Sequence, residues 1–494
     1  MTSYHLANLA LVFVVFLSGY VVSATFLTGK VEAALLAPAV GLLVYLNVSF
    51  ALALTVSIYS VELVFVALLV LSAALLICQT RRAPDASMIL RASALVFPFI
   101  FACLAVLVFW TLSGVLFRAT TLGHVDSLQY IMIGLHLQDQ TFFEWVNTYQ
   151  LWRRQLTVGF LHAPAALGGH IYLYTSQALV AVAVLGLTGW TLRRYRDNAL
   201  PDAFFWIVVA IALAAFLSLN RFVMHATYLN GHLLTGLLML AACIAGFPAF
   251  NRDRRERVYL TLVQSLSLIA LIITRMEGGV LAALVLLPTL ASRELSPVRR
   301  SIPLAALGIG LVAWNGFVFA IRFANDQSVA SYVYMMGGVG SVLIIAAMVL
   351  ISPLGRLIDR IPAGLIVGAP LAGSLALIAY DPANVVASVQ ATIANINRDW
   401  GYAIYGYLAL CIMCAIFSLS SLARFIRFPI LSYLPVMLIM GILRDNPFRN
   451  APADSFNRAL ISIFPLMIIL IVAAIMARQW DWPWRSGKRP PATP

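Results

Sequence analysis

Charged residues are scarce in this chain. Only 10% of its 494 residues are Asp, Glu, Lys or Arg, whereas 62% are hydrophobic and the mean hydropathy is +0.94. A soluble protein carries about a quarter charged residues, and a surface as apolar as this one would not stay in water. The composition therefore excludes a soluble globular protein and predicts a chain that lies almost entirely in a membrane.

Groups that bind metals or nucleotides are also few. The five cysteines fall inside apolar segments, where we expect them to pack as small apolar side chains, so neither a disulfide framework nor a zinc site is predicted. The sequence has no glycine-rich phosphate loop. We therefore predict no cofactor. A divalent ion held by Asp126 with Asp139 or Glu144 stays open, but no paired-acid motif indicates one.

Acidic and basic residues are missing from the middle of the apolar segments. A charge there would mark an ion or proton path, but only neutral residues such as Asn47, Gln264 and Asn315 occupy such positions. This pattern counts against a proton-coupled transporter. The sequence also lacks an internal repeat of the length that transporters have, which weakens the interpretation as an exporter further.

Apolar runs long enough to cross a bilayer as helices recur from end to end. In lipid every backbone polar group must be paired within its own segment, so these runs must be helices. The fold predicted is an all-α polytopic membrane protein with about fifteen transmembrane helices. They are expected to begin near residues 7, 33, 58, 93, 171, 204, 230, 259, 279, 302, 332, 363, 402, 429 and 459. The odd count puts the N-terminus outside and the C-terminus inside.

The net charge of +13 comes from basic clusters at every second connection between apolar runs. These clusters are Arg81/Arg82/Arg91, Arg193/Arg194/Arg196, Arg252/Arg254/Arg255/Arg257, Arg293/Arg299/Arg300, Arg356/Arg360, Arg424/Arg427 and Arg485/Lys488/Arg489. Such a pattern sets membrane topology and does not indicate a nucleic-acid partner. Nearly all the basic residues are arginine, which favours a GC-rich bacterial genome. We therefore predict a multi-pass protein of the bacterial inner membrane.

The remaining connections should lie together on the outer, periplasmic face. The longest spans residues 118–170, and shorter ones are expected at 221–232, 275–279, 324–331, 381–401 and 444–458. They hold about half of the acidic residues and most of the histidines. Loops carry binding groups while a rigid scaffold positions them, so we expect one shared site on this face.

The outer connection at 118–170 contains two amphipathic segments. Apolar residues at Leu128, Ile131, Leu135 and nearby positions predict a helix lying in the membrane interface, with Asp126 at its start. A second segment at 142–161 combines Trp, Tyr and Arg, which suits the headgroup layer. Asp126 at a helix start also has a purely structural interpretation, because an acid there stabilises the helix N-terminus.

Three short motifs resemble those of GT-C-type membrane glycosyltransferases. Asp126-Ser127-Leu128-Gln129-Tyr130 is similar to the family's acid followed by a tyrosine, with Ser127 where a second acid is frequent. Arg275-Met276-Glu277-Gly278 resembles an Arg-x-Glu-Gly turn, and Arg458 followed by Pro465 resembles the start of a late transmembrane helix. The resemblance covers about residues 93–478. It implies a GT-C-like module there, preceded by three additional helices in 1–92 and followed by a cytoplasmic tail at 479–494.

The resemblance implies transfer of a sugar from a polyprenyl-phosphate donor to a glycan, lipid or protein acceptor on the outer face. The catalytic base implied is Asp126, since a carboxylate must take the proton of the acceptor hydroxyl. Arginine suits the leaving phosphate because it can form two parallel hydrogen bonds. The substrate- and phosphate-binding residues predicted are Arg275, Glu277, Arg458, Arg221, His124, Tyr130 and Arg449, without a metal site. The partners expected are the lipid-linked donor, the acceptor and membrane lipids, with no nucleic acid.

Each assignment has an alternative. Arg275 and Glu277 could form a structural ion pair, Arg458 could extend to lipid headgroups, and Arg449 could belong to a solvated loop network. For the whole chain the alternatives are an enzyme resembling O-antigen polymerases or ligases, and a polysaccharide or lipid exporter. Polymerases of that kind usually centre on a late outer loop, whereas the longest one here is early.

Overall fold

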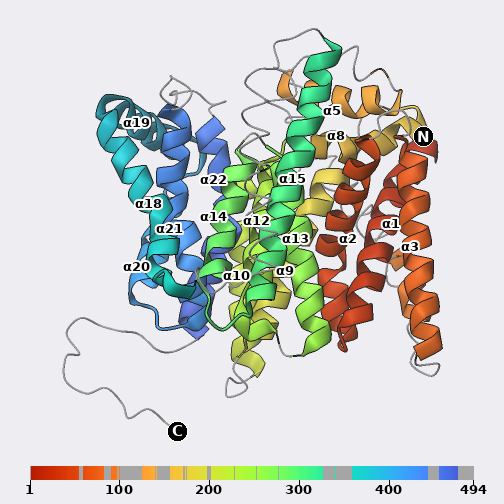
Figure 1. Ribbon diagram of the computed structural model, residues 1–494, viewed down its shortest axis with the longest axis horizontal. Coiled ribbons are helices and arrows are strands. Elements are labelled where there is room, and N and C mark those ends of the chain that lie inside the picture. The colour runs from red at the N-terminus through yellow and green to blue at the C-terminus, as the bar shows by residue number, and fades with distance from the viewer. Residues whose placement is uncertain are drawn as a thin grey trace.

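All the regular elements of the described structure are helices, and the part of the chain that is described contains no β-strand. The computed structural model describes residues 2–54, 59–82, 91–96, 99–100, 125–139, 141, 156–170, 173, 175–196, 202–226, 228–251, 253–275, 277–325, 340, 359–442 and 455–476. Most helices run side by side in one bundle (Figure 1). The chain is therefore a polytopic all-helical membrane protein.

Eight helices of the described residues are long and apolar enough to cross a membrane. These helices are α1 (Thr2–Phe26), α2 (Lys30–Ala53), α3 (Val61–Arg82), α9 (Thr175–Tyr195), α15 (Pro297–Ala324), α18 (Ala363–Tyr380), α21 (Ser421–Ile442) and α22 (Ser455–Met476). Shorter apolar helices are α10 (Asp202–Leu217), α12 (His232–Ala245), α14 (Gly278–Ala291) and α20 (Ala403–Phe417). The remaining helices are α5 (Val125–Gln138), α8 (Leu156–His162), η1 (Ala163–Gly168), α11 (Asn220–His225), η2 (Pro248–Phe250), α13 (Arg254–Ile272) and α19 (Pro382–Asp399).

Helices lie at the predicted starts that the structure describes, but only eight of the described helices are long and apolar enough to span, against the fifteen spans predicted for the whole chain. Helix α21 begins at Ser421, eight residues before its predicted start. The spans expected near 332 and over most of the segment after 93 lie outside the described residues. Several starts are sharpened by capping side chains, because Asp253, Ser296 and Asp381 each accept a hydrogen bond from a backbone N–H three residues on. Helix α13 consequently begins at Arg254, before the predicted start near residue 259.

The first two helices pack at very short range. A Cβ on Gly41 of α2 would lie 1.9 Å from the carbonyl oxygen of Val15, and a Cβ on Gly19 of α1 would lie 1.9 Å from that of Ala37. Both positions therefore require glycine, as in membrane helices that associate through small residues. The close contact joins the backbones of α1 and α2 into a rigid pair.

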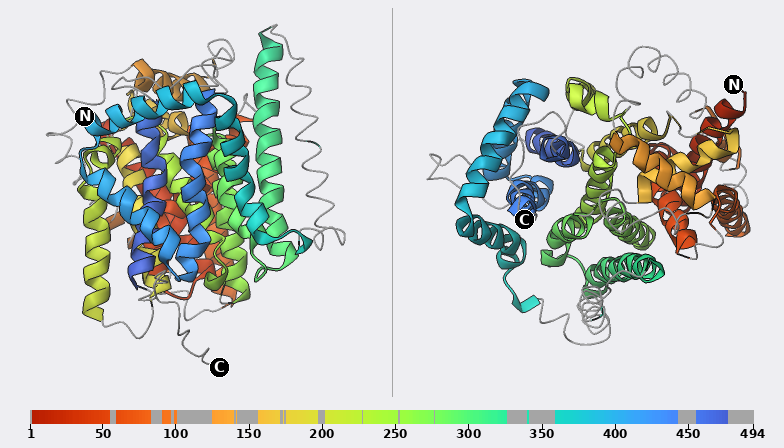
Figure 2. Two further views of the ribbon diagram at one scale, coloured as in Figure 1. Left: turned by 90° about the vertical axis from the view of Figure 1, so that its left-hand side faces the viewer. Right: turned by 90° about the horizontal axis from the view of Figure 1, so that it is seen from above.

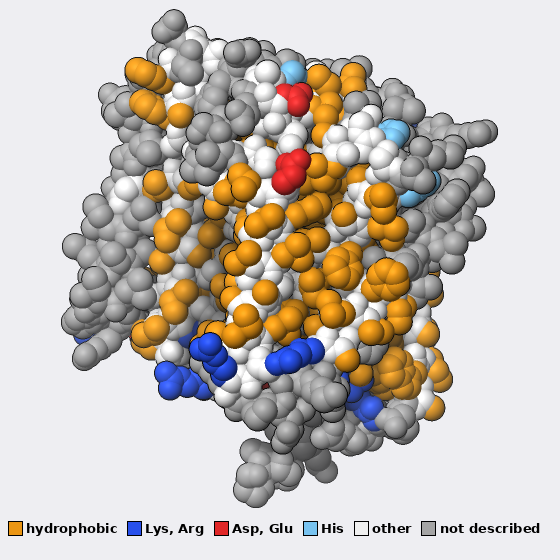
Figure 3. All heavy atoms as spheres, turned by 90° about the vertical axis from the view of Figure 1, so that its right-hand side faces the viewer, with side chains coloured by type: hydrophobic (Ala, Val, Ile, Leu, Met, Phe, Trp, Pro, Cys, Tyr) orange, Lys and Arg blue, Asp and Glu red, His pale blue; other side chains and the backbone are white. Residues whose placement is uncertain are grey.

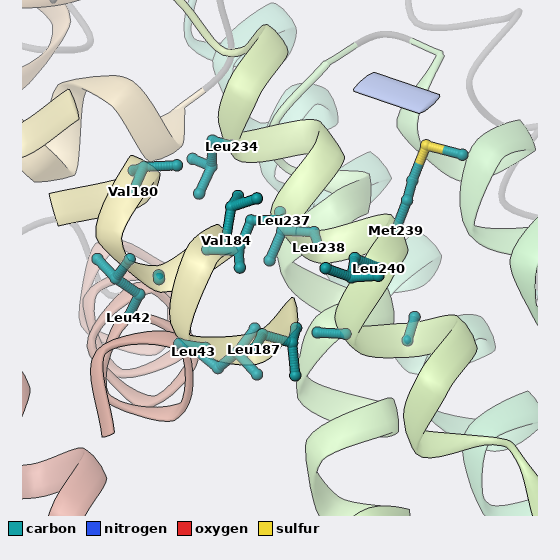
Figure 4. Close-up of a cluster of buried hydrophobic side chains, with 14 of the residues drawn as sticks. Leu42, Leu43, Val180, Val184, Leu187, Leu234, Leu237, Leu238, Met239 and Leu240 are labelled. Carbon is teal, nitrogen blue, oxygen red and sulfur yellow. The ribbon is translucent and has the colours of Figure 1, made fainter. Parts of the chain in front are cut away.

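The first two helices are also bonded to a later helix, α13. Asn47 of α2 donates from Nδ2 to the carbonyl of Leu266 in α13 at 3.1 Å, and the hydroxyls of Ser23 and Tyr259 lie 2.8 Å apart. Apolar side chains of α2, α9 and α12 then fill the space between those helices. Figure 4 shows this core, with Leu42 and Leu43 facing Val184 and Leu187 beside the leucines of α12.

The two ends of the bundle differ in charge. On the face drawn in Figure 3, Lys and Arg side chains gather at one end, acidic and His side chains lie toward the other, and a broad hydrophobic band separates them. Helices α5 and α8 lie across the end that carries the acids and histidines, and α19 lies across the same end (Figures 1 and 2). We call this the acidic end. The chain enters α1 at the acidic end, and α22 runs away from it.

Ion pairs tie the helices together at the opposite, basic end. Arg194 of α9 lies 3.4 Å from Glu32 of α2 and also contacts Glu256 of α13. Arg299 of α15 is 3% exposed and donates to Gln264 of α13 at 2.9 Å. Arg194 and Arg299 belong to the basic clusters that indicate the membrane topology, and they also join neighbouring helices.

One predicted interfacial segment differs from expectation. Residues 142–155 lie outside the described residues, and the described remainder forms α8, in which all seven residues are buried. Helix α5 packs on it so closely that a Cβ on Gly134 would lie 2.4 Å from the carbonyl oxygen of Gly159. Helix α8 is therefore covered by protein on all sides and does not present an amphipathic face to lipid.

Candidate functional site

Three arginines and two histidines from separate parts of the chain converge at the acidic end. We call Arg221, His225, His232, Arg275 and Arg458 the arginine–histidine cluster. The rings of His225 and His232 lie 5.7 Å apart, and the guanidinium of Arg275 contacts the ring of His232, with Nη1 3.0 Å from Nε2. All three arginines lie close enough to His225 to act on its charge. The cluster is therefore one electrostatic unit.

A single amide fixes the two histidines. The side-chain oxygen of Asn230 accepts the backbone N–H of His232 at 3.0 Å, and Nδ1 of His225 lies 2.9 Å from Nδ2 and 3.1 Å from Oδ1 of the same amide. When Nδ2 donates to Nδ1, the neutral ring carries its proton on Nε2. This Nε2 is buried and has no hydrogen-bond partner among the described residues.

His225 stays uncharged at neutral pH. Burial lowers the pKa of its imidazole to about 3, and the nearby positive charge of Arg221, together with that of Arg458 and Arg275, acts in the same direction. A protonated ring would add another positive charge to the cluster. The ring therefore serves as a fixed, neutral hydrogen-bond donor.

Arg275 and Glu277 occupy the turn between α13 and α14. Nε of Arg275 lies 3.1 Å from Oε2 of Glu277, whose side chain is 3% exposed. Burial lowers the pKa of Arg275, but the Glu277 carboxylate and neighbouring tyrosine oxygens more than offset this, so the pKa lies above its ordinary value. The turn needs glycine next, because a Cβ on Gly278 would lie 2.0 Å from the carbonyl of Leu271. The structural ion pair considered from the sequence is present.

Arg221 is paired with a carboxylate from a distant helix. Its Nη2 lies 2.5 Å from Oδ2 of Asp399, the last residue of α19, which also lies 3.5 Å from Arg398. Burial lowers the pKa of Arg221, although Asp399 opposes the change. Asp399 was not predicted as a site residue. Its only sequence signal was its place in an expected outer connection.

Arg458 enters the cluster from the first turn of α22. It is 9% exposed, and its Nη1 donates to the hydroxyl of Tyr228 at 3.3 Å. One turn further on, Ser462 donates to the carbonyl of His232 at 2.9 Å. The Arg458 guanidinium is therefore held inside the protein, which is the opposite of the alternative in which it extends to lipid headgroups.

The start of α5 lies beside the same loop. Ser127 donates from Oγ to the carbonyl of Leu229 at 3.3 Å. Leu229 lies between Tyr228, which contacts Arg458, and Asn230, which contacts His225. Tyr130 is buried and lies near enough to Arg275 to influence its charge. Asp126 is the second residue of α5. The side chain of Asp126 lies outside the described part of the structure, as do residues His124 and Arg449.

The described side chains of the cluster and its partners carry an excess of positive charge. Three guanidinium groups are balanced by two carboxylates, those of Glu277 and Asp399. A largely buried excess charge favours an anion, and arginine and a neutral imidazole N–H both suit phosphate oxygens. Among the described residues no group of three His, Cys, Asp or Glu side chains could hold a metal ion.

Besides Asp399, the sequence did not predict as site residues Tyr228, Asn230, His232 and His225. The two histidines were expected to lie near the outer face, but nothing in their spacing placed them against Arg275. Comparison with known proteins finds no family model, no curated protein and no solved structure that matches this chain. The fold and hydropathy define the class, a multi-pass helical membrane protein, and the function rests on the site alone.

Proposed function

We propose that this protein is a membrane glycosyltransferase that moves a sugar from a polyprenyl-phosphate donor to an acceptor hydroxyl at the acidic end of the bundle. The observation that carries the proposal is the convergence of three segments distant in sequence. The start of α5 lies against the loop at Leu229, the Arg275–Glu277 turn contacts His232, and Arg458 bonds to Tyr228. These are the segments whose motifs resemble the GT-C family.

The reaction is a displacement at the anomeric carbon of the sugar. The acceptor oxygen forms a bond to that carbon, the bond from the carbon to the phosphate oxygen breaks, and polyprenyl phosphate leaves with one additional negative charge. Asp126 takes the proton of the acceptor hydroxyl as general base. The position of its backbone beside Leu229 supports this role, because Ser127 bonds to that residue.

The cluster supplies the groups that stabilise the leaving phosphate. Arg458 and Arg275 present guanidinium groups whose positions are fixed by Tyr228 and Glu277, so little reorganisation accompanies the reaction. His225 adds the N–H of Nε2, which lacks a partner within the described structure. The excess positive charge of the cluster matches the charge that develops on the phosphate.

A test of this function compares acid substitutions at the two ends of α5, Asp126 near its start and Asp139 just after its end. Membranes containing Asp126→Asn, Asp139→Asn or the unaltered chain are given a panel of radiolabelled polyprenyl-phosphate hexoses and pentoses with an envelope fraction as acceptor. Loss of a general base lowers rates by about 10²–10⁴-fold, so we expect that fall for Asp126→Asn. Asp139 follows the far end of α5, and its substitution should leave transfer unchanged.

Equal transfer by the Asp126→Asn and Asp139→Asn membranes, at equal amounts of folded protein, would remove Asp126 from the mechanism. Absence of transfer from every donor by the unaltered chain would favour an exporter instead. Transfer only from lipid pyrophosphate donors would favour the enzyme class that resembles O-antigen polymerases and ligases.

A further inference from the structure

Helix α19 differs from its neighbours in direction. It joins the ends of α18 and α20 and lies across the acidic end of the bundle, roughly perpendicular to the spanning helices (Figure 2). Asp381 caps its first turn by accepting the N–H of Asn384 at 3.1 Å. It has 18 residues, as many as α18, but it is not among the helices apolar enough to cross a membrane. It is therefore a helix that runs along a surface.

Helix α19 leaves a row of large apolar side chains exposed. Val386, Val389 and Ile393 are 55%, 38% and 48% exposed, and their spacing of three and four residues puts them on one side. The side toward the bundle is mixed, with Ser388 and Asn395 at 1% and 0% exposed and Ile396 at 5%. A helix with an exposed apolar side of this kind is suited to lipid rather than to water.

The inward side chains of α19 have polar partners in the protein. Ser388 donates to the side-chain oxygen of Asn384 at 3.2 Å, and the side-chain oxygen of Asn395 accepts from Arg398 at 2.7 Å. At the end of the helix Asp399 pairs with Arg221 of the arginine–histidine cluster. The polar face is therefore satisfied internally, which leaves the apolar stripe as the surface to be covered.

The surroundings of α19 identify the material that covers this stripe. Tyr380 and Tyr402, which flank the helix at its two ends, are 83% and 84% exposed. Tyrosine gathers at the headgroup level of membranes because one end of its side chain is apolar and the other polar. The adjoining helices α18 and α20 expose apolar side chains in the same way, such as Leu375 and Ile412. The stripe thus lies between two apolar helices that also expose large apolar side chains.

We propose that α19 lies in the interface of the bilayer, with Val386, Val389 and Ile393 among the upper parts of the acyl chains. Ala387 and Ala394, seven residues apart on the side turned away from this stripe, face the headgroups and water. The membrane thereby fixes the position of α19, and Asp399, the last residue of α19, forms an ion pair with Arg221. This inference does not depend on the reaction proposed for the cluster.

Nitroxide labels on the two sides of α19 test the proposal. The full chain, with its five cysteines replaced by alanine, is labelled at position 389 or 393, or at the control position 387 or 394 on the other side of the helix, and reconstituted in phosphatidylethanolamine–phosphatidylglycerol vesicles. Collisions with apolar oxygen and with a water-soluble nickel chelate report depth. We expect the labels at 389 and 393 to be open to oxygen and protected from nickel, and the controls to show the reverse.

Two outcomes contradict the proposal. Nickel access at 389 and 393 equal to that at 387 and 394 would place the helix in water. Exclusion of both reagents at 389 and 393 would mean that protein, not lipid, covers the stripe. A second measurement retains the native cysteines: Val389→Trp should gain fluorescence quenching by lipids brominated on their acyl chains, whereas Ala387→Trp should gain none. Equal quenching of the two variants would also overturn it.

Discussion

Replacing Glu277 with glutamine should destabilise the protein by about 3 kcal/mol. At 3.1 Å the Glu277–Arg275 pair is worth about 5 kcal/mol of attraction at an effective dielectric constant of about 20. Removing one partner of a buried pair costs about 3–5 kcal/mol, because the other charge is left without compensation. The Arg275 side chain is 13% exposed and stays partly solvated, which puts the expected cost at the lower end.

The assay is reversible unfolding in mixed micelles, followed by tryptophan fluorescence. A loss of about 3 kcal/mol shifts the unfolding equilibrium by about a hundredfold. Glu294→Gln is the matched control, since Glu294 is exposed and its substitution should change stability by less than about 0.5 kcal/mol. Adding Arg275→Met to Glu277→Gln removes both buried charges and should recover much of the loss.

Equal stability of Glu277→Gln and the unaltered chain would refute this reasoning. So would a double variant whose loss is the sum of the two single losses, because independent effects mean that the two charges do not interact.

Three further substitutions probe the packing and the charge of the bundle. The pKa of His225 is about 3 in the folded protein against an ordinary value of 6.5, so the unfolded chain binds more protons between these two pH values. The free energy of unfolding should therefore fall by about 2 kcal/mol from pH 7 to pH 5. His225→Gln should abolish that component of the pH dependence. Gly41→Ala should cost about 2 kcal/mol or more in unfolding experiments, because its Cβ would meet the carbonyl of Val15, whereas Gly189→Ala, with open space around it, should cost almost nothing. Arg299→Leu should lower stability by about 2–3 kcal/mol, as it removes two donated hydrogen bonds at the basic end, and an unchanged unfolding midpoint would contradict that.

The sequence predicted helices well where hydrophobicity alone determines them. The bilayer imposes helices on long apolar runs, so α1, α2, α9 and α22 follow directly from the composition. The helix α5 was predicted from the spacing of its apolar residues. In contrast, α19 was expected only as part of an outer connection, since its apolar and polar residues indicate a helix but not which face the protein covers.

The site was predictable only in parts. The Arg275–Glu277 pair lies within one turn, and local spacing was enough to suggest it. The partner of Arg221 could not be inferred, because Asp399 is brought to it by the packing of α19 against α21 and α22. The same holds for Asn47 and Gln264, which were recognised as polar residues in apolar segments, while their partners in other helices depend on the tertiary fold.

The most direct test of the central claim is the stoichiometry of transfer by the purified protein in vesicles. With a radiolabelled polyprenyl-phosphate sugar and an acceptor, one polyprenyl phosphate should be released for each sugar that becomes linked to the acceptor. Movement of the intact lipid-linked sugar from one leaflet to the other, with no release of polyprenyl phosphate, would contradict a glycosyltransferase and identify a transporter.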